Sequence, residues 1–157
     1  MKKYNQQKDN FIKKFPDITL EQHAEQLSTC IKFNFKYFDN SQKCGQDFHN
    51  WNHEQLSKLL VKLKEFSKES IQYWTKHKIG HQGNTVLAIY DCFPIKSDFI
   101  HPKHIPLDVQ WACFRLESDM RLVGFLIPQN LNFENIILDK NTFYVVFLDE
   151  NHRFYLK

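Results

Sequence analysis

Residues 109–127 read VQWACFRLESDMRLVGFLI, and they give the clearest structural signal in the chain. Residues 109–116 and 121–127 are both apolar runs, and the ESDM segment between them has the composition of a turn. The sequence therefore predicts a β-hairpin. Because side chains alternate between the two faces of a strand, Trp111 and Arg115 are expected to share a face.

Further strands are predicted on both sides of this hairpin from alternating or continuous apolar segments. They are residues 30–38, 86–92, 133–138, 142–149 and 153–156. Three prolines between residues 93 and 108 predict an irregular connection there.

Helices are predicted in the N-terminal half. Residues 53–66 carry leucines at helical spacing, and Asn52 is a suitable N-cap with Gln55 three positions later. A helix over residues 10–28, broken near Pro16, and a short one through Trp74 are also expected.

This order of elements predicts an α+β fold, in which N-terminal helices pack on one face of a C-terminal antiparallel β-meander. The length of 157 residues fits a single domain over residues 1–157, with a helical half at about 1–80 and a β-rich half at about 81–157. No apolar run approaches the ~20 residues that span a bilayer, so a cytoplasmic protein without a membrane partner is expected.

Arginine is scarce, and its three occurrences, Arg115, Arg121 and Arg153, lie in the last 43 residues, whereas the other eighteen basic residues are lysines. An arginine in such a lysine-rich chain is expected where planar, bidentate recognition of phosphate or carboxylate is needed. The lysines give residues 1–80 a net charge of +5, while residues 81–157 carry −2. The basic half suits nucleic acid or an acidic protein, although a solvated lysine face explains the lysines alone.

Histidines occur in pairs three or four positions apart, a spacing at which two imidazoles can bind one metal ion. The pairs are His49 with His53, His77 with His81, and His101 with His104. No HExxH motif and no CxxC motif accompanies them, so neither a metal nor another cofactor is expected.

The C-terminal strands supply the candidate catalytic residues. His152 is suited to general acid or base catalysis near neutral pH. Arg115 or Arg153 is suited to holding a phosphate and stabilising transition-state charge. The alternative is that Arg115 pairs with Glu117 or Asp119, and that His152 and Arg153 form only an exposed turn.

Candidate substrate-binding residues surround these positions. Arg121 is expected near the same end of the hairpin, and Tyr155 or Trp111 is suited to stacking on a base. Two prolines stiffen the loop that carries His101, Lys103 and His104, so it could present these side chains together. The alternative for this loop is a structural connector.

Residues 114–116, 121–125 and 143–155 together resemble the C-terminal part of small uncharacterised bacterial proteins and the sheet of RelE-like ribonuclease toxins. In that family helices precede an antiparallel sheet that bears basic and aromatic residues. The resemblance covers about a third of the chain. It implies RNA cleavage, with roles for Arg115, Arg121, His152, Arg153 and Tyr155.

The first hypothesis for function is therefore a cytoplasmic bacterial protein of toxin–antitoxin or phage-defence type that binds RNA and cleaves it as a metal-independent endoribonuclease. The alternative is a non-catalytic immunity or antitoxin-type protein that binds and blocks a partner protein encoded by an adjacent gene. The oligomeric state stays open.

Overall fold

The computed structural model describes residues 6–81 and 83–157. The helices are α1 (Gln6–Ile12), α2 (Leu20–Thr29), α3 (His53–Phe66) and α4 (Ile71–Lys76), with a short 3-10 helix at Phe48–Asn50. The strands are β1 (Lys32–Asn34), β2 (Lys78–Ile79), β3 (Asn84–Thr85), β4 (Leu87–Ile89), β5 (Gln110–Arg115), β6 (Arg121–Leu126) and β7 (Thr142–Asp149). The predicted α+β class is confirmed.

Five strands form the main sheet in the order β1-β7-β6-β5-β4. The strands from β4 to β7 are antiparallel neighbours, as the meander predicts, and the predicted hairpin is the β5–β6 pair. β1 adds to the outer edge of β7 in parallel, and α3 and α4 follow it in the chain before β4, which forms the opposite edge of the sheet. β2 and β3 form a separate two-stranded sheet.

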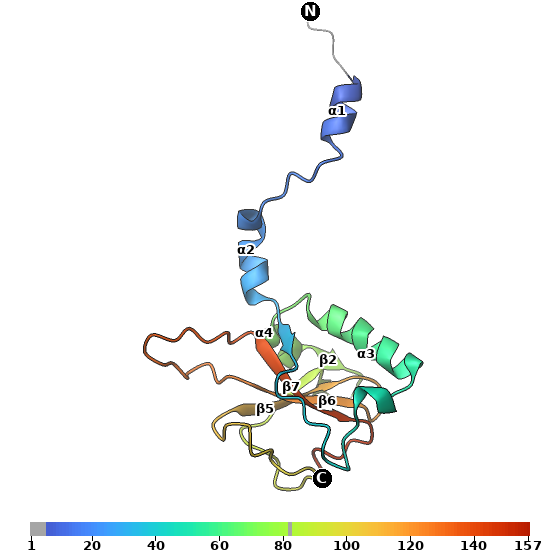
Figure 1. The fold of residues 1–157 in the computed structure, drawn as a ribbon, viewed down its shortest axis with the longest axis vertical. Coiled ribbons are helices and arrows are strands. Elements are labelled where there is room, and N and C mark those ends of the chain that lie inside the picture. The colour runs from blue at the N-terminus through green and yellow to red at the C-terminus, as the bar shows by residue number, and fades with distance from the viewer. Residues whose placement is uncertain (1–5, 82) are drawn as a thin grey trace, which may run out of the picture.

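The sheet is buried on both faces, by different kinds of structure (Figure 1). α3 and α4 cover one face, where Phe66 stacks on Phe114 with ring centroids 4.3 Å apart. The irregular connection after β4 and the C-terminal segment cover the other face, which has Trp111, Phe147 and Phe154 at its centre. Two hydrophobic layers therefore hold the sheet rigid, so its strand ends are firm supports for functional side chains.

Two predicted strands do not form. Residues 133–138 belong to a long loop between β6 and β7, with a single isolated bridge between Phe133 and Ile136. Residues 153–156 form no strand because the Asp149 carboxylate accepts hydrogen bonds from the backbone N–H groups of Arg153 and Phe154, which turns the chain back after β7. The predicted strand over residues 30–38 is shortened to β1.

α1 and α2 do not pack on the sheet, so the prediction of N-terminal helices on one face holds for α3 and α4 only. Neither α1 nor α2 contains a buried residue, and Figure 1 shows both helices extending away from the sheet. We call residues 6–29 the N-terminal arm. Its large apolar side chains are at least half exposed: Phe11, Ile12, Phe15, Ile18, Leu20 and Leu27. Among the described residues, no helix has both the length and the apolar character needed to cross a membrane.

The arm predicts a stability result. Phe15 is 60% exposed and its ring contacts that of Phe11, whereas Phe66 in the core is 1% exposed. Phe15→Ser is therefore expected to change the free energy of unfolding by no more than about 0.5 kcal/mol, as at other surface sites. Phe66→Ala is expected to lower it by about 3–5 kcal/mol. Urea denaturation of both variants checks this, and an equal loss in both would mean that the arm packs on the body of the protein.

Candidate nucleic-acid interface

Three adjacent strands bring charged side chains into one row at the end of the sheet. Arg115 on β5 lies opposite Arg121 at the start of β6, and Arg121 lies opposite Asp149 at the end of β7. Residues directly opposite each other in an antiparallel sheet point to the same face. This face is the one that carries Trp111 and the irregular connection. We call Arg115, Arg121, Asp149 and His152 the arginine cluster.

Among the residues that the structure describes, the two arginines of this cluster have no carboxylate partner. Arg121 is 8% exposed, its Nη1 donates to the carbonyls of Ser118 and Met120 at 2.8 Å, and its buried Nε meets no acceptor in the described part of the chain. Nη1 of Arg115 donates to the carbonyl of Thr85. Within residues 6–81 and 83–157 neither guanidinium forms an ion pair, so the alternative that Arg115 pairs with an acid of the turn is not found.

Asp149 is fully buried, and its hydrogen bonds serve the backbone. Its Oδ1 accepts from the N–H of Arg153 at 3.0 Å and its Oδ2 accepts from that of Phe154 at 2.8 Å. The carboxylate therefore fixes the turn after β7. It makes no ion pair with Arg121 among the described residues, and the partly exposed guanidinium of Arg115 keeps capacity for a further anion.

His152 lies in this turn with a positive φ of 53°, which is uncommon for a residue other than glycine. Burial lowers the pKa of its imidazole, and the charges of Arg121 and Arg115 lower it further, while Asp149 and Asp119 act in the opposite direction. The ring is therefore mostly neutral at pH 7. The neutral form is the one that accepts a proton, as a general base must.

A pocket of about 530 Å³, which we call the tyrosine pocket, lies where the chain leaves β4, beside the backbone hydrogen bond from Tyr90 to Trp111. Tyr155 is 44% exposed and stacks on Tyr90, with ring centroids 5.2 Å apart and planes at 16°. The Tyr90 hydroxyl lies 3.3 Å from Sγ of Cys113. Burial raises the pKa of this hydroxyl, and the positive charge of Arg115 acts in the opposite direction. Lys96 and Lys157 are also among the lining residues. The pocket thus combines an exposed aromatic ring with positive charge.

Arg153 and Trp111 are predicted site residues that do not belong to the arginine cluster. Nε of Arg153 donates to Oδ2 of Asp98 at 2.7 Å, in an exposed ion pair that occupies its guanidinium. Trp111 is 1% exposed and packs against Phe93 and Phe154, so its ring has no free face for a base. Of the predicted residues, the structure brings together Arg115, Arg121 and His152, whereas Tyr155 lies in the tyrosine pocket against Tyr90.

The loop with the two histidines lies elsewhere on the same face. The His101 ring packs against Trp111, which is four residues from Arg115 and thus about 14 Å away along β5. His104 stacks on Tyr37 with centroids 6.3 Å apart, and Lys103 is exposed. The loop therefore packs as a connector over the sheet. Within the part of the chain that the structure describes, no three histidine, cysteine or carboxylate side chains are grouped as metal ligands.

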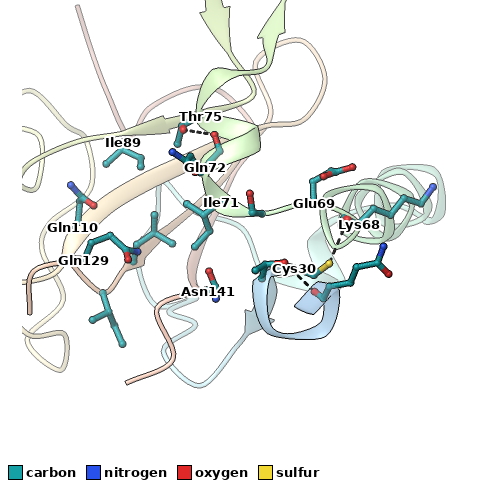
Figure 2. Close-up of a pocket in the computed structure, with 15 residues that line it drawn as sticks. Cys30, Lys68, Glu69, Ile71, Gln72, Thr75, Ile89, Gln110, Gln129 and Asn141 are labelled. Atoms are coloured by element: carbon teal, nitrogen blue, oxygen red, sulfur yellow. Dashed lines mark hydrogen bonds between the residues drawn. The ribbon is translucent and has the colours of Figure 1, made fainter. Parts of the chain in front are cut away.

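One pocket has no counterpart among the predicted sites. It has a volume of about 780 Å³, and Figure 2 shows the residues that line it. Gln110 and Leu126 place it at the opposite end of the β5–β6 pair from Arg115 and Arg121. We call it the amide pocket, because five side-chain amides line it: Gln26, Gln72, Gln110, Gln129 and Asn141. These positions span most of the chain at irregular spacing and form no motif, so only the fold reveals them.

No family model matches the chain, and no curated protein or solved structure matches it either. The function is therefore argued from the geometry of these sites.

Proposed function

We propose that the protein acts on RNA as a metal-independent ribonuclease of toxin–antitoxin or phage-defence type in the bacterial cytoplasm. The observation that carries this proposal is the arginine cluster, in which Arg115 and Arg121 lie side by side without a carboxylate partner and next to His152. Two guanidinium groups of this kind suit a phosphodiester. The resemblance of the C-terminal strands to RelE-like toxins and the lysine-rich half of the chain point the same way.

The residues suit cleavage through the ribose 2′-hydroxyl. The neutral imidazole of His152 takes the proton of the 2′-OH, the 2′-oxygen forms a bond to phosphorus, and the bond from phosphorus to the 5′-oxygen breaks. The leaving 5′-oxygen takes a proton from water, which gives a 2′,3′-cyclic phosphate and a 5′-hydroxyl end. Arg115 and Arg121 stabilise the negative charge that grows on the phosphoryl oxygens. Tyr155 stacks on a base beside the cleaved bond.

Incubation of the purified protein with single-stranded RNA in EDTA tests this function. Cleavage is expected to yield 2′,3′-cyclic phosphate ends, identified by mass spectrometry of the fragments. The rate is expected to rise with pH and to level off with a midpoint below 6.5, because His152 must lose its proton and its pKa is lowered. Absence of cleavage at any enzyme concentration, or a midpoint well above 6.5, contradicts the proposal.

A second function is favoured by the N-terminal arm, whose apolar side chains contribute nothing to the core. Short isolated helices are marginal in water, so such an arm gains stability against another protein. An immunity or antitoxin-type protein that blocks a partner would use it this way. That function predicts no RNA cleavage and a stable complex with the product of an adjacent gene, which Phe15→Ser weakens; co-purification at native expression levels measures it.

A further inference from the structure

The amide pocket is formed where three parts of the fold meet. The end of α2, the segment joining α3 to α4, and the strand ends around Gln110 and Leu126 supply its walls. Figure 2 shows Ile71 and Cys30 between the two sides of the pocket, with Gln72 on α4 and Gln110 and Gln129 across from them. Its volume of about 780 Å³ lies within the range of pockets that hold small organic ligands.

The amides of this pocket are available to a ligand. The side chains of Gln72, Gln110 and Gln129 make no hydrogen bond to any residue that the structure describes. Asn141 donates its amide N–H to the carbonyl of Ser28 at 2.7 Å, which leaves its side-chain oxygen free to accept. An amide group presents a donor and an acceptor next to each other, and three such groups converge here without partners.

The remaining walls are apolar or carry charges of opposite sign, which suits an uncharged ligand with apolar surface. Ile71 and Ile89 provide apolar surface, and the charged residues at the pocket, Lys68 and Glu69, have opposite signs. Paired donors and acceptors next to apolar surface match the edges and faces of a heterocyclic base, which asparagine and glutamine recognise through two hydrogen bonds. We propose that the amide pocket binds a nucleobase.

The position of the pocket connects it to the candidate site. Ile89, on the edge strand β4, lines both the amide pocket and the tyrosine pocket, so the two pockets meet at the end of this strand. β5 runs from Gln110 in the amide pocket to Arg115, a distance of about 17 Å, and the two side chains lie on opposite faces of the sheet. An RNA strand with a phosphate at the arginine cluster therefore reaches the amide pocket around the edge strand β4, past Tyr155 in the tyrosine pocket. The inference that the base belongs to RNA rests on the proposed function. The inference that the pocket binds a base is independent of it.

Calorimetric titration of the full chain with adenosine, guanosine, cytidine and uridine tests this, with ribose as the probe that lacks a base. At least one nucleoside is expected to bind, and ribose is not. Gln110→Leu and Gln72→Leu are each expected to weaken binding about tenfold, since each removes hydrogen bonds to the base. Gln7→Leu, an equivalent change on the exposed surface of α1, is the control and should leave binding unchanged. Gln72 is exposed on α4, so its replacement leaves the core intact.

Binding of no nucleoside, equal binding of ribose, or binding unaffected by both pocket variants would overturn the inference. Displacement of the bound nucleoside by a short single-stranded RNA identifies RNA as the source of the base. Failure of that displacement, with nucleoside binding intact, assigns the pocket to a free nucleoside. RNA cleavage without nucleoside binding overturns the pocket assignment and leaves the ribonuclease proposal standing, so the two failures are distinguishable.

Discussion

His152→Asn is expected to slow RNA cleavage by about 10²–10⁴-fold, the usual contribution of a general acid or base. Asparagine is the suitable replacement because His152 has a φ of 53°, and asparagine tolerates this left-handed conformation better than alanine does. The turn after β7 should therefore keep its shape while the proton acceptor is lost. Single-turnover rates on one RNA substrate in EDTA measure the change, and the pH-dependent limb of the rate should disappear in the same variant.

Arg115 and Arg153 provide the internal comparison for this experiment. Arg115→Ala is expected to slow cleavage by about 10²–10³-fold, because it removes one donor to the transition-state charge. Arg153→Ala should change the rate by less than about fivefold, since its guanidinium is held by Asp98 in an exposed ion pair worth at most about 1 kcal/mol. An Arg153→Ala rate as low as that of His152→Asn, or an unchanged rate in His152→Asn, would refute the assignment of roles.

The sequence predicts those elements whose signal is local. α3 begins and ends as predicted, because Asn52 and Gln55 form a capping box and the leucines that follow repeat at helical spacing. β5, β6 and β7 agree with the prediction to within two residues, since each apolar run ends at a polar turn. The convergence of Arg115 with Arg121 also follows from the hairpin, once its register is known.

The features that the sequence does not predict depend on contacts between distant residues. The side chain of Asp149 captures the backbone after β7, so the segment at Phe154 turns although its composition favours a strand. The spacing of apolar residues in the arm would be the same whether or not its helices packed on the rest of the chain. The exposure of Phe15 is therefore visible only in the fold. Cys44, in a polar segment, is buried beside the carbonyl of Asp98, 54 positions away.

Asp149 is expected to be the most sensitive polar residue in the protein. Asp149→Asn keeps the volume of the side chain but turns one hydrogen-bond acceptor into a donor that faces a backbone N–H, of either Arg153 or Phe154. Each hydrogen bond to a charged group contributes about 1.5–3 kcal/mol, and a buried donor without a partner costs about 1–3 kcal/mol. The free energy of unfolding should therefore fall by about 3 kcal/mol or more.

Urea denaturation at pH 7 measures this loss, with Asp98→Asn as the matched control. Asp98 is exposed and its ion pair with Arg153 is open to solvent, so the control should lose no more than about 1 kcal/mol. If Asp149→Asn were no less stable than Asp98→Asn, the turn would be held by something other than the carboxylate. Since the same turn carries His152, the folded fraction of Asp149→Asn should also cleave RNA more slowly than the wild type, and Asp98→Asn should not. The buried carboxylate thus affects cleavage by holding the imidazole of His152 beside Arg121. The free energy of unfolding and the cleavage rate are therefore expected to fall together in Asp149→Asn and not in Asp98→Asn.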